Sequence, residues 1–456
     1  MDNIKFLIDV FTEERNNTSI IWRNKKYDYG WLIKSIKKYR NLLDESKVLA
    51  GTVCAIQSNY SPNTIALFFA MISKNCIVVP ITSINENQIE YLVKASYVDL
   101  IFRKDSNDEF EIIKVRNKLS NDLILSLKVD KRPGLILFSS GSTGEMKVIL
   151  LDFVRLFKKF FIKKRKFVTV SFLLFDHIGG LNTMLYCLSN GGSLVIAEQR
   201  DPNYILELIE NHKVELLPTS PTFMNLILLG GNYESYDLSS LKLITYGTEP
   251  MLEFTLQKFR SVFPSIKLQQ TYGLSEVGIL RSKSESSDSL FLKVGGEGFE
   301  TKIVDGILHI KAESSMVGYL NSPNPISKDG WFNTQDLVEE KGEFIRILGR
   351  KSDIINVGGQ KVYPGEVENL IQEIESVIDV VVYGKENPII GNFVCAKVRL
   401  ISEITSSEED DMRSIILNYC SENLDDHFKV PMEIDFTTKD LHNQRFKKSR
   451  NSNDII

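Results

Sequence analysis

The stretch SSGSTGEMK at residues 139–147 decides which fold class and which kind of site the sequence predicts. It follows the apolar run LILF at residues 135–138 and ends on Lys147. Small residues let backbone N–H groups approach anionic oxygens, hydroxyls add donors, and the terminal ammonium adds positive charge. A strand that runs into such a loop predicts a polyphosphate-binding turn. Taken alone, the same pattern is equally typical of an ordinary turn rich in Ser and Gly.

Two common nucleotide-binding motifs are excluded by their spacing. A Walker A loop requires Gly immediately before the lysine, and Met146 holds that place. The dinucleotide-binding fingerprint fails as well, because no GxGxxG opens a helix after the first predicted strand. The sequence therefore argues against a P-loop kinase or NTPase.

Three further segments follow the loop along the chain: TYGLSE at 271–276, GWFNTQDL at 330–337 and GRKSDIINVGGQKVYPGEVE at 349–368. In this order and at these separations, the four blocks resemble the adenylate-forming superfamily of acyl- and aryl-CoA synthetases, nonribosomal-peptide adenylation domains and luciferases. The resemblance covers most of the chain, from about residue 20 to about residue 450. The last block is most similar to the standalone ligases, including the o-succinylbenzoate-CoA ligase type.

The resemblance implies a ligase that uses ATP and Mg²⁺ to convert a small carboxylic acid to an acyl-adenylate. The acyl group then passes to CoA or to the phosphopantetheine of an acyl or peptidyl carrier protein. Glu276 is expected to hold Mg²⁺ and Ser275 to donate to the α-phosphate, although many relatives carry Thr at that place. The expected nucleotide- and cofactor-binding residues are Ser139, Ser140, Gly141, Ser142, Thr143, Gly144, Lys147, Gly247, Thr248, Glu249, Thr271, Tyr272, Gly273, Asp336, Arg350, Gly359 and Lys361.

Asp336 matches the acid that accepts the ribose hydroxyls in the family, and Arg350 matches a cation that also reaches the ribose. In isolation, an Asp at such a place is more typical of a cap or turn. His177, in LLFDHIGGLNTML, matches the histidine at the wall of the acyl pocket, where a lone His is otherwise more often structural. Apolar residues around the YGLSE turn favour a hydrophobic or aryl acid.

The family places a catalytic lysine in a Gly-Lys-x-x-Arg tail, and this tail reads LHNQRFKKSRN at 441–451. Counting back from the arginine selects Lys447, which we favour, whereas counting forward from the leucine selects Lys448. A solvated basic tail is the alternative. Ser352 matches the hinge position of the family. Gly359 and the glycine before it either make room for pantetheine or merely close a hairpin.

Short β-branched runs alternate with longer amphipathic stretches, a pattern typical of an α/β fold. The expected architecture is a large domain at 1–350, with layered α/β subdomains and a β-rich subdomain after about residue 290. A small, mobile α+β domain is expected at 351–456. In it we expect a helix from Pro364 to about Glu375, strands at 378–383 and 393–400, and an acidic helix from Ser406.

Composition narrows the class of protein. The 456 residues are 43% hydrophobic and 25% charged, with a formal net charge of −4, which gives no reason to expect nucleic acid or a membrane as partner. The Lys-rich stretch at 158–166 predicts a solvated helix face in preference to a docking patch. Five scattered cysteines predict buried thiols in a reducing compartment, and we expect a cytoplasmic protein. A non-catalytic nucleotide- or acyl-binding relative is the alternative function.

Overall fold

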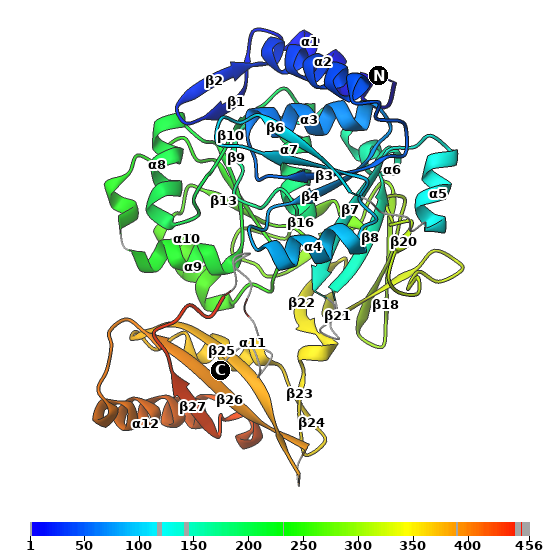
Figure 1. The fold of residues 1–456 in the computed structure, drawn as a ribbon. Coiled ribbons are helices and arrows are strands. Elements are labelled where there is room, and N and C mark those ends of the chain that lie inside the picture. The colour runs from blue at the N-terminus through cyan, green and yellow to red at the C-terminus, as the bar shows by residue number, and fades with distance from the viewer. Residues whose placement is uncertain are drawn as a thin grey trace.

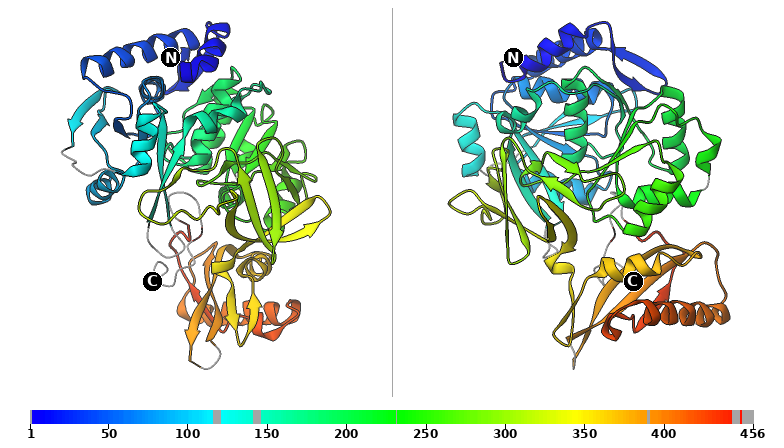
Figure 2. Two further views of the ribbon diagram at one scale, coloured as in Figure 1. Left: turned by 90° about the vertical axis from the view of Figure 1, so that its right-hand side faces the viewer. Right: turned by 180° about the vertical axis from the view of Figure 1, so that it is seen from behind.

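The computed structural model describes residues 2–115, 121–140, 146–230, 232–388, 391–442 and 448. It confirms the α/β class: a large N-terminal part holds two seven-stranded sheets and a six-stranded sheet, and a small C-terminal domain lies below it (Figure 1 and Figure 2). The boundary expected at residue 350 stays a prediction.

The first seven-stranded sheet is parallel except at one edge, where β2 runs antiparallel to β1. Parallel strands with helical crossovers are typical of α/β layers. In spatial order its strands are β13 (Lys267–Gln270), β12 (Leu243–Tyr246), β11 (Leu216–Thr219), β9 (Val168–Val170), β10 (Ser193–Val195), β1 (Thr18–Trp22) and β2 (Lys25–Asp28).

The second seven-stranded sheet is mixed, because β7 and β8 form an antiparallel hairpin beside the parallel strands. Ser139 and Lys147 lie at the open end of that hairpin. In spatial order the strands are β20 (Gly318–Tyr319), β8 (Met146–Asp152), β7 (Gly134–Ser140), β4 (Ile77–Ile81), β3 (Val53–Gln57), β5 (Leu100–Lys104) and β6 (Phe110–Lys114).

Helices α3 (Pro62–Ser73) and α7 (Ile178–Ser189) fill the space between these two sheets. Almost all their residues are buried, as expected for helices that are apolar on every side. Both belong to one core cluster that also contains residues from both sheets, such as Leu194 and Leu135. The alternate residues of β7, Ile136 and Phe138, point to a different cluster, because successive strand residues face opposite sides.

Helices α1, α2 and α6 extend the central core around α3 and α7, and the other helices of the large part cover the outer faces of the sheets. One outer core packs α8, α9 and α10 against the first sheet, and another packs α4 and α5 against the second. The bounds of these and the other helices are α1 (Lys5–Glu13), α2 (Tyr29–Glu45), α4 (Glu86–Ala95), α5 (Asp122–Val129), α6 (Phe153–Phe157), α8 (Pro202–His212), α9 (Pro221–Gly230) and α10 (Glu253–Val262).

The β-rich part after residue 270 is the predicted third subdomain. Its sheet has the order β16 (Ser282–Ser284), β17 (Leu292–Val294), β22 (Phe344–Arg350), β21 (Phe332–Lys341), β19 (Ile307–Ala312) and β18 (Phe299–Val304). A separate small hairpin joins β14 (Gly273–Leu274) to β15 (Gly278–Ile279).

The C-terminal domain packs two helices on a five-stranded sheet. Its elements are β23 (Ile355–Val357), β24 (Gln360–Val362), α11 (Pro364–Ile371), β25 (Val377–Asn387), β26 (Gly391–Leu400), α12 (Ser406–Asn423) and β27 (Glu433–Phe436). The two expected strands and the acidic helix are confirmed. The helix that begins at Pro364 is shorter than expected, because the Gln372 side chain donates to Val377 O and Ile378 O where the chain turns into β25.

The helix expected over the Lys-rich stretch 158–166 is wrong beyond Phe160. A 3-10 helix covers Lys158–Phe160, and the chain then leaves the helix axis. Lys163 and Lys166 form ion pairs with Glu13 and Glu14, at the end of α1. These contacts with a distant part of the chain override the local helical pattern.

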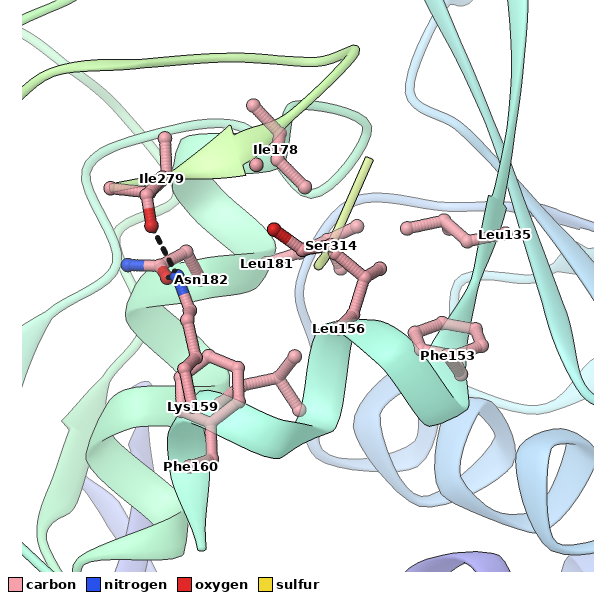
Figure 3. A pocket seen from close by; sticks show the side chains of 12 residues that line it. Leu135, Phe153, Leu156, Lys159, Phe160, Ile178, Leu181, Asn182, Ile279 and Ser314 are labelled. Carbon is pink, nitrogen blue, oxygen red and sulfur yellow. Dashed lines mark hydrogen bonds between the residues drawn. The ribbon is translucent and has the colours of Figure 1, made fainter. Parts of the chain in front are cut away.

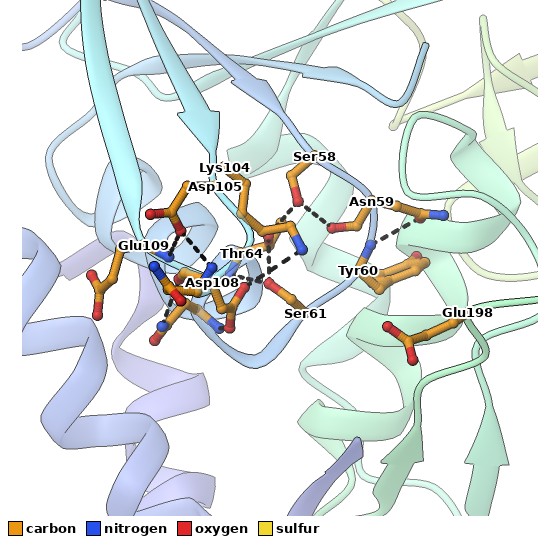
Figure 4. Close-up of polar contacts among 12 residues, drawn as sticks. Ser58, Asn59, Tyr60, Ser61, Thr64, Lys104, Asp105, Asp108, Glu109 and Glu198 are labelled. Atoms are coloured by element: carbon orange, nitrogen blue, oxygen red, sulfur yellow. Dashed lines mark hydrogen bonds and ion pairs between the residues drawn. The ribbon is translucent and has the colours of Figure 1, made fainter. Parts of the chain in front are cut away.

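The turn between β5 and β6 caps helix α3, which positions the end of β3 (Figure 4). Asp108 is buried in a left-handed conformation, with φ +65°. Its carboxylate accepts the Asn63 N–H at 3.3 Å, and its carbonyl accepts the Asn63 side-chain amide at 2.8 Å. A carboxylate at a helix N-terminus is favoured by the helix dipole. Asp108 therefore helps to cap the N-terminus of helix α3.

Among the described residues, every helix is too short or too polar to span a bilayer. All five cysteines are buried and unpaired, as predicted.

A small apolar cavity of about 20 Å³ lies between α6, α7 and β15, and Lys159 is one of its walls (Figure 3). The Lys159 ammonium donates to Ile279 O at 2.8 Å and to the Asn182 side chain. Burial lowers the pKa of Lys159 to about 7, and the charge of Arg281 adds to this effect. The lysine therefore joins α7 to the strand that follows the YGLSE turn.

The lowered pKa of Lys159 predicts a pH-dependent stability. Between about pH 7 and 10 the unfolded chain binds more protons at this lysine than the folded chain, so folding is favoured as pH rises. From about pH 7 to about pH 10, we expect the free energy of unfolding of the parent protein to rise by about 1–3 kcal/mol more than that of Lys159→Met. Urea unfolding at both pH values measures this difference. Lys158→Met, at an exposed neighbour, is the control, and an equal pH slope in parent and Lys159→Met would contradict the expectation.

Candidate functional site

The candidate site forms around Tyr319, because the two-residue strand β20 lies against β8. Tyr319 pairs with Ile149, which lies two residues after Lys147 on the same strand. The Tyr319 hydroxyl donates to Glu276 Oε1 at 2.9 Å. This short segment therefore brings Glu276 close to the base of the Ser- and Gly-rich loop, although the two are far apart in sequence.

The predicted polyphosphate loop is the tip of the β7–β8 hairpin. Ser139 pairs with Lys147, and Ser140 with Met146, at the open end of the hairpin. The Lys147 ammonium donates to Ser322 Oγ at 3.0 Å, just beyond β20. The residues at the tip itself, Gly141, Ser142, Thr143 and Gly144, lie outside the described residues.

Ser275 and Glu276 lie in the turn between β14 and β15. Two bonds hold this turn: Met316 N donates to Glu276 O at 2.7 Å, and Ser314 Oγ donates to Val277 O at 2.6 Å. Glu276 is buried and forms no ion pair with any residue in the described part of the chain. One carboxylate together with phosphate oxygens is a common way for a protein to hold Mg²⁺.

Asp336 and Arg350 face each other on neighbouring strands, β21 and β22, as a direct pair. Arg350 Nε lies 3.3 Å from Asp336 Oδ1. The Tyr272 hydroxyl donates to Asp336 Oδ2, and burial together with this carboxylate raises the pKa of Tyr272. Asp336 N also donates to Thr334 Oγ1 at 3.0 Å. Tyr272, Asp336 and Arg350 therefore meet, as the sequence predicted.

The two halves of the site are joined through Tyr319. Burial raises the pKa of its hydroxyl, and the charge of Glu276 raises it further, whereas the charge of Arg350 lowers it. Both charges thus act on the same hydroxyl group. Tyr272, four residues before Glu276, bonds to Asp336, and Tyr319 links Glu276 to the strand that carries Lys147. Sequence reasoning missed Tyr319. A Gly-Tyr pair before a turn is too common in protein sequences to identify Tyr319 as a site residue.

A second pair of loops meets at the carboxyl ends of β12 and β13. Thr271 N donates to Tyr246 O at 2.7 Å, and a Cβ on Gly247 would lie 2.6 Å from Thr271 O. Gly273 is equally constrained, because its Cβ would lie 2.6 Å from Gly278 O. Only glycine allows this approach. The expected loops 247–249 and 271–273 are therefore adjacent.

Thr248 and Glu249 show how the first of these loops is held. Thr248 has φ +74°, a strained conformation for a β-branched residue, and its buried hydroxyl has no hydrogen-bond partner among the described residues. Glu249 Oε1 accepts the Thr222 N–H at 2.8 Å, at the start of α9. Burial raises the pKa of Glu249, and the hydrogen bonds from Thr222 and the charge of Lys448 oppose this. Glu249 is thus engaged at a helix terminus.

His177 precedes α7 and caps it: its Nδ1 accepts the Gly179 N–H at 3.2 Å. Gly180 is required next to it, because a Cβ there would lie 2.0 Å from Leu174 O. Gly180 therefore permits close packing of α7 against the backbone at Leu174. His177 has a capping function in addition to its predicted place at the acyl-pocket wall.

The tail contributes one described lysine. Lys447 lies outside the described residues, whereas Lys448 is placed and largely buried. The Lys448 ammonium donates to Val380 O at 2.7 Å and lies 3.1 Å from Asp379 and 3.8 Å from Glu368. Lys448 is therefore bound within the C-terminal domain.

Gly359 and Lys361 lie on the β23–β24 hairpin of the C-terminal domain, and Ser352 lies in the 3-10 helix Lys351–Asp353 that follows Arg350. Gly358 and Gly359 have φ +57° and +88° and form the exposed turn between β23 and β24, which is the hairpin alternative. Gly359 N donates to Asn356 Oδ1 at 2.9 Å, so the Asn356 side chain supports this turn. Ser352 is exposed, and its hydroxyl donates to Asp353.

Comparison with known proteins identifies the class. Residues 9–306 match the AMP-binding enzyme family, and residues 366–448 match the AMP-binding enzyme C-terminal domain. The chain therefore belongs to the AMP-binding, adenylate-forming family, in its acyl- and aryl-CoA ligase branch. ATP binding is a property of this family.

Two curated relatives illustrate the relationship. The chain is 30% identical over 266 residues to 4-coumarate–CoA ligase 1 of Arabidopsis thaliana, a match that covers 53% of this chain and 47% of that protein. It is 28% identical over 292 residues to a long-chain-fatty-acid–CoA ligase of Bacillus subtilis, covering 58% and 52%. The matches span about half the length of these relatives.

Solved structures of the same fold are more complete matches. An anthranilate CoA ligase in complex with anthranoyl-AMP superposes with a TM-score of 0.81 at 18% identity, over 97% of this chain and 95% of that one. The o-succinylbenzoate CoA synthetase of Bacillus subtilis, with its acyl-adenylate intermediate, gives 0.76 at 19% identity over 98% and 97%. At these identities the likeness shows the fold.

Gln335 is a strained residue next to the site. Its φ is +62°, in the left-handed region, where glycine is favoured. We expect Gln335→Gly to raise the free energy of unfolding by up to about 1 kcal/mol, because the strain is relieved. Thermal unfolding measures the change. Glu339→Gly, on the same strand without a positive φ, is the control and should lower stability by about 0.5–1 kcal/mol. The expectation is contradicted if both substitutions destabilise equally.

Proposed function

We propose that this protein activates a carboxylic acid with ATP and transfers the acyl group to a thiol. The observation that carries the proposal is that strand pairing and hydrogen bonds through Tyr319 and Tyr272 connect the elements of Lys147, Glu276, Asp336 and Arg350. An acid that attacks the α-phosphorus of ATP requires a clamp for the leaving pyrophosphate, compensation of charge and an anchor for the sugar. Each of these needs has a candidate residue among these four.

In the first step, a carboxylate oxygen bonds to the α-phosphorus, and the bond to pyrophosphate breaks. Lys147 and the loop before it bind the leaving phosphates, and Ser275 donates to the α-phosphate. Asp336 accepts hydrogen bonds from the ribose hydroxyls, and Arg350 supports it. Glu276 would hold Mg²⁺, which supplies charge stabilisation to the phosphate oxygens when bound. Lys447 supplies positive charge to the acid.

In the second step, a thiol sulfur bonds to the acyl carbon and AMP leaves with its phosphate. A turn of the C-terminal domain about Ser352 precedes this step, after which Gly358, Gly359 and Lys361 face the site. The loop at 247–249 and His177 line the pocket for the acid, whereas Tyr272 and Gly273 form the turn against which adenine stacks. The apolar residues at 277–280 favour a hydrophobic or aryl acid. CoA and a carrier-protein phosphopantetheine are both candidate acceptors, and titration of one against the other separates them.

A non-catalytic nucleotide- or acyl-binding protein is the second candidate, and the placement of Lys448 favours it. A lysine bound by Asp379, Glu368 and a backbone carbonyl is not available to an incoming carboxylate. If Lys447 does not act in its place, the tail lacks its cation. Tight binding of ATP or an acyl-adenylate without turnover would then be the activity.

The ligase proposal predicts acid-dependent exchange of pyrophosphate into ATP. With a panel of aryl and fatty acids, we expect Glu276→Gln and Asp336→Ala each to reduce the exchange rate by about 10²- to 10³-fold, since each removes charge or hydrogen bonds from the transition state. Glu313→Gln, in an exposed ion pair with Lys158, is the matched control and should retain parental exchange. Absence of any acid-dependent exchange by the parent protein would overturn the ligase proposal.

The two steps should be separable by substitution. We expect Lys447→Ala to lower acyl-adenylate formation by at least about 10²-fold while thioester formation from supplied acyl-adenylate is largely kept. Ser352→Pro should do the reverse, because proline restricts the φ change that a hinge requires. Separate assays of each half-reaction measure this, with Lys439→Ala on the exposed end of the same domain as control. Equal rates in parent and Lys447→Ala would instead support the non-catalytic alternative.

A further inference from the structure

Helix α10 begins without a capping side chain of its own. The residue before it, Leu252, is apolar and makes no side-chain hydrogen bond to the helix. The first N–H groups of a helix have no partner within the helix, so an acceptor from elsewhere is favourable. Asn369 on α11, in the C-terminal domain, supplies it: its Oδ1 accepts the Phe254 N–H at 2.9 Å. A residue of one domain therefore caps a helix of the other.

A second polar contact crosses the same boundary. Asn225 on α9 donates through its Nδ2 to Ile378 O, near the start of β25, at 3.0 Å. The same carbonyl accepts the Gln372 side chain at 2.8 Å, so both of its acceptor positions are used. Helices α9 and α10 pack side by side in the large part, and the C-terminal domain lies against this end (Figure 1).

These contacts are adjacent to the residues that hold the tail. Ile378 O accepts a hydrogen bond from Asn225. Asp379, which follows Ile378, forms an ion pair with Lys448, and Val380 O accepts a hydrogen bond from the same ammonium. Three consecutive residues of one strand thus connect the large domain to the tail. The charges of Lys448 and Asp379 also act on the Glu249 carboxylate, in the loop that borders the predicted nucleotide site.

The arrangement of the domains in this structure suits the first half-reaction. The charge of Lys448 reaches Glu249 in the loop at 247–249, whereas the exposed turn at Gly358 and Gly359 belongs to a hairpin that pairs within the sheet of the C-terminal domain. A thiol-accepting arrangement would reverse these positions, under the function proposed above on which this inference rests. The two interdomain hydrogen bonds must break for that reversal.

We propose that Asn225 and Asn369 are positioning residues for acyl-adenylate formation. They act through the C-terminal domain, by holding it where its tail reaches the nucleotide. Neither residue touches the reacting atoms. A hydrogen bond of this kind shifts a conformational equilibrium by about 2- to 10-fold. Losing one should therefore redistribute the domain orientations without unfolding either domain.

The two asparagines have opposite hydrogen-bonding roles, and this provides a sharp test. Asn→Asp keeps the acceptor at 369 but removes the donor at 225, where it also places a carboxylate oxygen opposite Ile378 O. We expect Asn369→Asp to behave like the parent and Asn225→Asp to lose the arrangement. Asn369→Leu, which removes the acceptor at similar volume, should match Asn225→Asp.

The first readout is the distance between labels on Lys258→Cys in α10 and Glu422→Cys in α12, two exposed positions on opposite domains. The native thiols are buried and do not compete for the label. In Asn225→Asp and in Asn369→Leu, the ratio of molecules at other label distances to molecules at the parental distance should rise about 2- to 10-fold. An unchanged distance distribution in both variants would overturn the inference whatever the activity.

The second readout is the split between half-reactions. Asn225→Asp and Asn369→Leu should slow pyrophosphate exchange by the same 2- to 10-fold and leave thioester formation from supplied acyl-adenylate equal or faster. A merely structural role would slow both reactions alike and would contradict the inference. If the parent shows no exchange at all, the ligase proposal fails, while the label distances still decide the role of the two asparagines.

Discussion

The hydrogen bond from Tyr319 to Glu276 is the contact on which the whole candidate site depends. It exists because two residues of chain, β20, add to the edge of β8 and carry the tyrosine across the boundary between the mixed sheet and the β-rich subdomain. On one side of this boundary lies the loop that ends at Lys147, and on the other lie Asp336 and Arg350. Neither side alone provides both a phosphate clamp and a sugar acceptor, so the placement of β20 determines whether the site is assembled.

Much of this site follows from local sequence. Four site residues each lie in a short sequence block whose residue types predict a binding role: Lys147, Glu276, Asp336 and Arg350. The structure connects the elements that carry them. The strands that border the central layer were also predictable, because their apolar runs are short and β-branched. Helices α3 and α7 are apolar on all sides, and the sequence marks them as buried.

The rest depends on contacts between distant parts of the chain, which no local pattern contains. Tyr319 and Ser322 have partners that lie far from them in sequence. The helix expected across the Lys-rich stretch ends at Phe160, because Lys163 and Lys166 pair with carboxylates on α1. Gln335 is left-handed although its side chain does not favour that conformation, so the position is imposed by the strand pairing around Asp336. Asn369 is an ordinary helical residue in sequence and a helix cap only in the folded chain.

The burial of α3 and α7 between two sheets has a consequence for synthesis on the ribosome. Helix α2, made before α3, covers one side of it, but strands such as β10, whose residues share its core, are made more than a hundred residues later. Until they emerge, a nascent chain exposes the remaining apolar surface of α3, and such surfaces aggregate. The first half of this protein is therefore expected to rely on chaperones during translation. A truncation before β10 would leave an incompletely folded, aggregation-prone fragment.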